Sequence, residues 1–350
     1  MDVAAVERIA KAVLYEGYML YPYRPSAIKN RQRFNFGVLH PQCHNLAQAG
    51  LEPWTIQTEC LAGAGEGGTL QVRLRFLQIV DRTVARVAAP IRELRTETVL
   101  HQVDSLEIDG RLFHPWQEAV EQEVALPNFK LADIAANPCS ERFHFPATTE
   151  LEALCDRSGQ VCGAVVRRKN ELRGSVRVSA TQLSDRIFRI SLSVDNQSDC
   201  APVAPREEAL LASLVSTHFV LGIEDGAFIS LVEPPDDAQE FVAGCRNSGM
   251  WPILVGEPAR RDTLLCSPII LYDYPQIAPE SPGDLFDGAE IDEILSLRIL
   301  TLTDEEKREM RQSDERARQV LERTEYLPPE QWMKLHGAFR DLHPAKEKTR

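Results

Sequence analysis

Apolar and polar residues alternate in several short stretches of the chain, and this pattern predicts an α+β protein. The predicted strands lie close together and mostly lack long helices between them, which favours antiparallel pairing over a doubly wound sheet. We therefore expect a β-rich body with antiparallel sheets and short peripheral helices. A capping pattern and a charged helical stretch near the end of the chain add a helical C-terminal extension.

Changes of composition along the 350 residues divide the chain into three expected parts. Residues 1–200 are expected to form the β-rich body. Residues 201–302 are expected to form an α/β segment that ends in a wrapped proline-rich stretch. Residues 303–350 are expected to form the helical C-terminal extension. A chain of this length can bury a sizeable core without a disulfide or a metal.

The first elements are predicted from spacing. Residues 3–16 carry apolar side chains at helical intervals, and Gly17 follows the last turn. Residues 34–39 are expected to form a strand. The glycine-rich residues 63–68 open a strand rather than a helix, so they predict a hairpin loop and not a dinucleotide-binding loop. Residues 70–76 alternate between apolar and polar side chains, as a strand with one wet face does.

Further hairpins are expected in the middle of the chain. Residues 106–113 are expected to form a hairpin with its turn at Asp109 and Gly110, because Asp-Gly is a preferred sequence for a tight two-residue turn. Residues 175–179 and 188–194 both alternate and are expected to pair antiparallel. A helix is expected over residues 206–216. Two strands joined by a turn at Asp225 and Gly226 should follow it, over residues 219–232.

The stretch from Cys266 to Leu302 is rich in proline, apolar and aromatic residues. Its prolines argue against a helix or a central strand. Its apolar content argues against disorder. We expect residues 268–288 to follow an ordered path over a surface of the protein or of a partner.

The helical extension begins with a capping box, in which Thr303 caps and Glu306 reaches back. A charged helix is expected from there to about Arg323, and a second helix after Leu327. The first helix carries a narrow apolar stripe, which should lie on the body or on a partner. Deletion of residues 303–350 is expected to leave the body folded and to weaken partner binding.

Composition limits the classes of function. The net charge of −13 argues against non-specific binding to nucleic acid or to an anionic membrane. The sequence contains no apolar run long enough to span a membrane and no basic and apolar leader at its start. The eight cysteines form no C-x-x-C pair, which is typical of reduced, mostly buried thiols in a cytoplasmic protein.

One short motif is a candidate metal site. His40, Cys43 and His44 place imidazole and thiol groups close together, and these groups bind zinc, nickel or copper. Further ligands, such as Cys60, would have to come from elsewhere. The alternative is a turn with one buried cysteine and two exposed histidines, and it requires no metal or other cofactor.

Two groups of residues are candidate contacts for a protein partner. Aromatic and basic side chains gather near the N-terminus, and a partner, an anion or a base could contact them. The members of this group are Tyr21, Tyr23, Arg24, Arg31 and Arg33. The second group would share one face of the last helix and comprises Trp332, Leu335 and Phe339. The alternative for the first group is a structural role, in which the arginines pair with acidic residues.

No sequence motif indicates a reaction. The chain contains no G-x-S-x-G, no H-E-x-x-H and no phosphate-binding P-loop, so no catalytic residue is assigned. A site assembled from distant residues leaves no such signature. The residues alone do not give the function, and we expect a non-enzymatic protein that binds a partner. The alternative is a metal-handling protein or an enzyme with a site around His40, Cys43 and His44.

Residues 15–41 and 267–311 resemble an uncharacterised bacterial family whose genes lie near those of uptake nickel–iron hydrogenases. The resemblance implies a cytoplasmic accessory or scaffold protein that acts in hydrogenase assembly or function. Its partner would be a hydrogenase subunit or a maturation factor. The family has no active-site motif to transfer, so the resemblance assigns no role to any residue.

Overall fold

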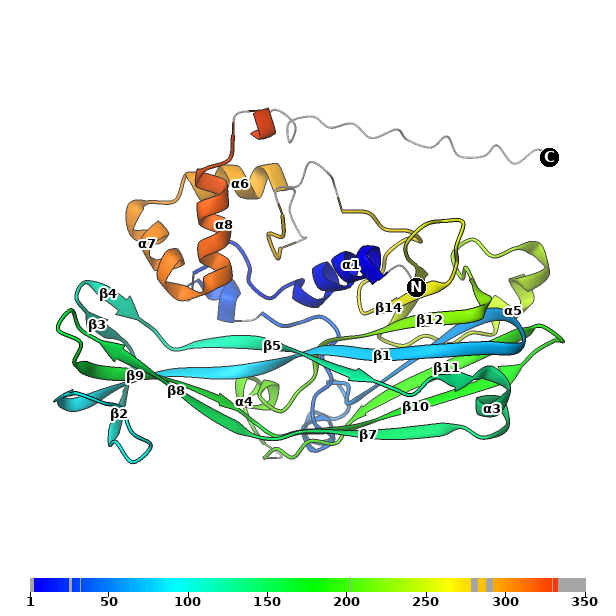
Figure 1. Cartoon of the computed structure of the whole chain (residues 1–350), viewed down its shortest axis with the longest axis horizontal. Helices are drawn as coiled ribbons and strands as arrows, with labels where there is room; N and C mark the ends of the chain where they lie inside the picture. Colours follow the sequence, from blue (N-terminus) through cyan, green and yellow to red (C-terminus); the bar gives the residue numbers. More distant parts are fainter. Residues whose placement is uncertain are drawn as a thin grey trace.

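The computed structural model describes residues 3–24, 27–31, 33–201, 203–277, 283–287, 292–328 and 330–332. It confirms the α+β prediction: one large antiparallel sheet curls around a core, and short helices and a helical C-terminal region accompany it (Figure 1). A second, small sheet is a two-stranded hairpin. Every helix in the described part of the chain is too short or too polar to span a bilayer.

Strand β1 organises the large sheet. It runs from Thr55 to Ile91, and its neighbours change along its length. On one side it pairs in turn with β11 (Ile187–Asn196), β6 (Phe129–Lys130), β5 (Trp116–Ala125) and β2 (Leu100–Val103). On the other side it pairs with β12 (Val215–Ile229) and then with β9 (Val161–Lys169). The right-handed twist of strands accumulates along the 37 residues of β1, and the sheet curls.

The other strands extend the sheet from these neighbours. They are β7 (Cys139–Phe145), β8 (Thr148–Cys155), β10 (Leu172–Gln182), β13 (Trp251–Leu254) and β14 (Thr263–Ser267). Strands β10 and β11 confirm the predicted antiparallel pair, with Val176 opposite Val194. Strands β11 and β12 lie on either side of residue 200 in the sequence, and both pair with β1.

The small hairpin confirms the predicted turn at Asp109 and Gly110. It joins β3 (Leu106–Ile108) to β4 (Arg111–Phe113). The φ angles of Asp109 and Gly110 are 52° and 82°, as a type I′ turn requires.

Two predicted turns are wrong. Residues 63–68 do not form a hairpin loop but lie inside β1. The register changes from Ala64 opposite Gly226 to Thr69 opposite Glu224, which makes this stretch a β-bulge. On the facing side, residues 215–229 form one continuous strand, β12, and Asp225 with Gly226 make no turn. Glycine is required at position 68 in this bulge, because a Cβ there would lie 2.6 Å from the Cβ of Ala64.

Two element predictions need smaller corrections. The helix expected over residues 206–216 ends early, because α4 spans only Arg206–Leu210. Strand β12 begins soon afterwards, at Val215. The strand expected over residues 34–39 is reduced to one bridge between Leu39 and Leu214.

Helices α1, α6, α7 and α8 lie together on one face of the large sheet (Figure 1). They span Val3–Tyr15, Asp292–Leu300, Asp304–Ser313 and Glu315–Glu325. The capping box at Thr303 is confirmed, but the single predicted helix is two helices. Asp314 ends α7 and caps α8, where its carboxylate accepts a hydrogen bond from the Arg316 amide at 2.7 Å.

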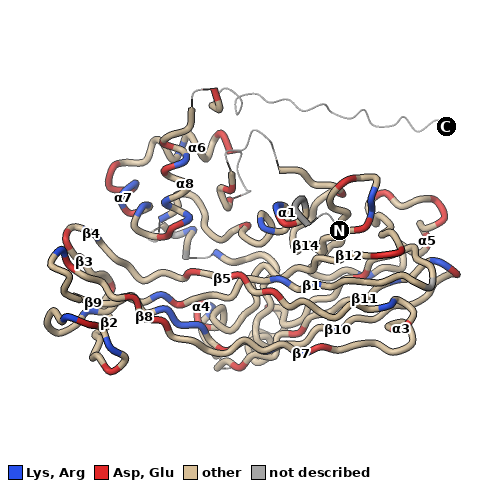
Figure 2. The backbone as a smooth tube through the Cα atoms, viewed as in Figure 1, with Lys and Arg blue, Asp and Glu red and all other residues tan. Residues whose placement is uncertain are grey.

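Short helices complete the described chain. They are η1 (Ile28–Arg31), α2 (Gln42–Ala47), α3 (Leu131–Ala136), η2 (Asp236–Ala238) and α5 (Gln239–Ala243). Ion pairs connect neighbouring strands, and Figure 2 shows basic and acidic residues interspersed along them. Arg82 and Arg167, for example, both contact Glu118, at 2.9 and 2.7 Å. Cross-strand pairs of this kind each contribute roughly 0.2–1 kcal/mol.

The protein has two main cores. The larger lies inside the curled sheet, where Phe76, Phe219 and Phe228 are fully buried. The second lies between the sheet and the helical layer. It combines Tyr18 and Trp116 with apolar residues of α6, α7 and α8. The stripe predicted for the C-terminal helix belongs to this second core; its members are Met310, Ala317, Val320 and Leu321.

Candidate functional site

The candidate metal ligands His40 and His44 are both buried, with exposed fractions of 1% and 2%. His40 precedes α2, and His44 lies within it. Their rings lie side by side, with centroids 5.0 Å apart. This burial corrects the expectation that both histidines would be exposed.

Hydrogen bonds fix the His40 ring. Its Nδ1 lies 3.2 Å from the hydroxyl of Ser213, and its Nε2 lies 3.2 Å from a carboxylate oxygen of Glu52. Burial lowers the pKa of His40 to about 4, against the opposing effect of Glu52. The ring is therefore neutral at neutral pH. Among the described residues, the buried Nδ1 of His44 has no hydrogen-bond partner.

Cys43 does not join these histidines in a cluster. Its Sγ instead lies 2.9 Å from the Sγ of Cys200. Cys60, considered as a further ligand, is buried in the larger core. Within the described part of the chain, no three His, Cys, Asp or Glu side chains are placed to hold a metal ion together.

The N-terminal aromatic and basic residues lie mostly inside the protein. Tyr23 is fully buried, and its hydroxyl donates a hydrogen bond to the Leu285 carbonyl at 2.6 Å. Arg33 is buried with its guanidinium Cζ 3.6 Å from the centre of the Trp116 ring. Burial lowers the pKa of Arg33 to about 10. Both side chains therefore belong to the second core and present no surface to a partner.

The other candidate partner residues lie in different settings. Tyr21 is half-buried, and Arg24 forms ion pairs with Glu306 at 3.0 Å and Glu309 at 3.6 Å. These ion pairs match the structural alternative for this group. Trp332 is half-buried. The Arg31 side chain, Leu335 and Phe339 lie outside the described residues.

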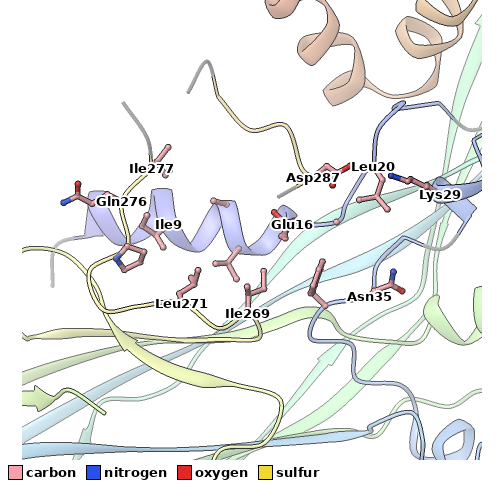
Figure 3. Close-up of a pocket in the computed structure, with 15 residues that line it drawn as sticks. Ile9, Glu16, Leu20, Lys29, Asn35, Ile269, Leu271, Gln276, Ile277 and Asp287 are labelled. Carbon is pink, nitrogen blue, oxygen red and sulfur yellow. The ribbon is translucent and has the colours of Figure 1, made fainter. Parts of the chain in front are cut away.

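One cavity beside α1 was not predicted from the sequence. It has a volume of about 770 Å³ and lies between α1 and residues 269–277 (Figure 3). Its walls are mainly apolar; they include Ile9, Val13, Leu20, Phe36, Ile269, Leu271 and Ile277. Cavities of this size and character are typical of binding sites.

Polar groups lie toward the end of α1 in this cavity. Figure 3 shows Lys29 and Asp287 near Leu20, with Glu16 between them and the start of the helix. Asp287 is itself buried and accepts a hydrogen bond from the Tyr21 amide at 3.1 Å. The cavity is therefore mainly apolar, with charged side chains toward the end of α1 and the amide of Gln276 at the opposite end (Figure 3).

Gly17 forms the corner at which α1 meets the other walls. Its φ of 71° is one that glycine adopts without strain. Its amide donates a hydrogen bond to the Phe286 carbonyl at 2.9 Å. A Cβ at this position would lie 3.1 Å from the ring of Phe36. Glycine therefore allows the N-terminal and C-terminal walls to meet.

One signal in the sequence pointed to this region. The proline-rich stretch was expected to follow a surface, and residues 269–277 do lie along α1 (Figure 3). Residues 278–282 and 288 of the expected ordered path lie outside the described residues. The sequence did not show that this stretch and α1 enclose a cavity, because no local pattern records the distance between two remote segments.

The chain matches no known family model and no curated protein.

Proposed function

We propose that this protein is a non-enzymatic accessory protein, and that an apolar segment of a protein partner enters the cavity between α1 and residues 269–277. One observation carries the proposal: two segments far apart in the sequence form a cavity of about 770 Å³ with apolar walls. An apolar cavity that opens beside exposed apolar side chains is the kind of surface that binds another chain.

Apolar side chains around the cavity support this function. Ile277 lines the cavity and is 41% exposed. Tyr272 belongs to the same stretch and is 82% exposed. Partly exposed aliphatic and aromatic residues of this kind are common at the centres of protein interfaces.

The nature of the partner is proposed from the family resemblance. The cavity walls come largely from residues 15–41 and 267–311, the two stretches that resemble the hydrogenase-associated family. The two stretches that carry the resemblance thus lie on both sides of one cavity. We therefore propose a hydrogenase subunit or a maturation factor as the partner, with binding in the cytoplasm.

The test is affinity purification from a host that carries the nickel–iron hydrogenase genes, followed by mass spectrometry. The change is Ile277→Glu, which places a charge at the cavity. The matched control is Ile270→Glu, an exposed isoleucine of the same stretch that does not line the cavity. We expect a hydrogenase protein with the wild type and the control, and a loss of affinity of tenfold or more, about 1.4 kcal/mol, with Ile277→Glu.

Two results would contradict the proposal. In the first, no hydrogenase protein is recovered with the wild type. In the second, both glutamate variants retain the same partner with the same affinity, which would place the contact elsewhere on the molecule.

A second candidate function is metal handling at His40 and His44. It is favoured by the buried Nδ1 of His44, which has no hydrogen-bond partner among the described residues. The two imidazoles offer fewer ligands than the four that a structural zinc site uses. The unpaired imidazole nitrogen therefore supports metal handling less strongly than the cavity supports partner binding. The test is metal analysis of untagged protein after dialysis against nickel or zinc. One equivalent that is lost in His44→Ala and kept in His101→Ala, an exposed control, would favour metal handling.

A further inference from the structure

Two thiols lie in direct contact on the body of the protein. The Sγ of Cys43, in the first turn of α2, is 2.9 Å from the Sγ of Cys200, which follows β11. This separation exceeds a disulfide bond of about 2.05 Å by about 0.9 Å. Both residues are half-buried and both thiols are free. Of the eight described cysteines, only these two have sulfur atoms in contact.

Hydrogen bonds connect the two segments that carry these thiols. The side-chain amide of Asn196 donates hydrogen bonds to the carbonyls of Leu39 and Ala212, at 2.8 and 2.9 Å. The first of these bonds connects the end of β11 to the segment that leads into α2. The Cys43 thiol also lies 3.3 Å from the Cys200 carbonyl. The sulfur atoms therefore need little backbone movement to form a bond.

We propose that Cys43 and Cys200 form a reversible disulfide, with a low-molecular-weight disulfide of the glutathione type as the oxidant. The thiolate of Cys43 attacks one sulfur of the oxidant, forms a mixed disulfide and releases one thiolate. Cys200 then loses its proton and attacks the Cys43 sulfur, which releases the second thiolate. Two protein thiols are oxidised, and one small disulfide is reduced to two thiols.

The positions of the two sulfur atoms allow the second step. Because the Sγ of Cys200 lies 2.9 Å from the Sγ of Cys43, a mixed disulfide on Cys43 forms directly beside the second thiol. Thiol–disulfide exchange requires the attacking sulfur to reach a sulfur of the disulfide. Cys200 can therefore complete the second attack without a further reactant.

The bond would be a covalent link between distant parts of the chain. It would join residues that are 157 positions apart. It would also fasten α2, which carries the buried His44, to the end of β11. A link of this length restricts the unfolded chain more than the folded one. The oxidised protein is therefore expected to resist unfolding more than the reduced protein does.

The test uses the full chain and oxidised glutathione, with thiol counting and mass spectrometry of an unreduced digest. We expect the count to fall from eight to six, a peptide that joins Cys43 to Cys200, and full recovery with excess reduced glutathione. Cys200→Ser should instead retain glutathione on Cys43, because the second attack is lost. Cys155→Ser removes an exposed thiol and should still form the linked peptide.

Two results with the wild-type protein would overturn the proposal. A wild-type protein that carries only glutathione adducts, or whose linked peptides involve other cysteines, shows that the pair does not close. A linked peptide that excess reduced glutathione fails to open shows that the bond is not reversible. Either result is read from the wild type, so it does not depend on how well a variant folds.

Discussion

At the scale of single residues, side-chain chemistry was visible in the sequence but side-chain location was not. Tyr23 and Arg33 are the residue types that interfaces favour, and both are buried. Their partners come from far away: Tyr23 donates to the Leu285 carbonyl, and Arg33 donates to the Gln117 carbonyl. A local pattern cannot show which remote carbonyl accepts a hydrogen bond from these side chains, so the sequence left both a structural role and a protein interface open.

His218 is a buried residue to which the sequence analysis assigned no role. It lies in β12 and is completely buried, and its Nδ1 is 2.8 Å from the Ser216 carbonyl. Within the described residues its Nε2 has no hydrogen-bond partner. Burial, and to a smaller extent the nearby Arg75, lowers the pKa of His218 to about 4. The folded protein therefore holds a neutral imidazole.

This lowered pKa predicts a dependence of stability on pH. An unfolded histidine gains a proton below about pH 6.5, whereas folded His218 gains one only near pH 4. The unfolded state therefore binds more protons in this window, and the free energy of unfolding falls as the pH drops from 6.5 to 4. For this one group the loss reaches about 3 kcal/mol. Denaturant unfolding at a series of pH values measures it.

The comparison with variants isolates the contribution of His218. His218→Gln removes the titrating group, so its stability should fall less steeply than that of the wild type over the same window. His101→Gln changes an exposed histidine and should keep the wild-type slope. Equal slopes for the wild type and His218→Gln would contradict the assignment.

At the scale of elements, strands with clear alternation were predicted well. Strands β10 and β11 pair as expected, because their apolar residues must share one face. The Asp-Gly pairs at 109 and 225 look alike in sequence but differ in structure. The first makes a turn, whereas the second lies inside β12 opposite the bulge of β1. The bulge, rather than the dipeptide, decides the outcome at residue 225.

The close approach of neighbouring strands explains why a glycine, which strands generally disfavour, lies at position 174. Gly174 lies in β10, between its neighbours β11 and β7. A Cβ at this position would overlap the Phe143 ring and lie 2.7 Å from the Asp195 carbonyl oxygen. The missing side chain is therefore required by residues of two other strands. Such a requirement is visible only when the pairing of the sheet is known.

At the scale of the whole molecule, the C-terminal helices belong to a core rather than to an appendage. Met310, Val320 and Leu321 have exposed fractions of 0–1% and pack with Tyr18 and Leu77. The narrow apolar stripe suggested a weakly attached helix, because the sequence of one helix does not reveal which other residues pack against its apolar face. The structure adds the sheet and the N-terminal aromatic residues that this stripe covers. The cavity has the same origin, since its walls also come from both ends of the chain.

This arrangement changes the expectation for deletion of residues 303–350. Removal of α7 and α8 would expose the second core and would take away the carboxylate of Asp314, which accepts the Tyr18 hydroxyl at 2.9 Å. Loss of several buried aliphatic side chains costs about 2–5 kcal/mol each, and most domains have a total stability of only about 5–15 kcal/mol. We expect the chain that ends at Leu302 to lose its cooperative thermal transition and to bind a hydrophobic dye.

The matched control is a chain that ends at Trp332. It keeps every described contact of α7 and α8, including the Lys307–Glu325 pair at 3.4 Å, so its transition should stay close to that of the full chain. If the chain that ends at Leu302 unfolds as sharply as the control does, the second core is dispensable. The tail would then regain its place as a separable candidate for binding the partner. If only the longer chain folds, partner binding must be tested by point substitutions such as Ile277→Glu. Truncation at Leu302 would then unfold the part of the protein that forms the cavity walls, so it could not separate a role of the tail from a role of the cavity.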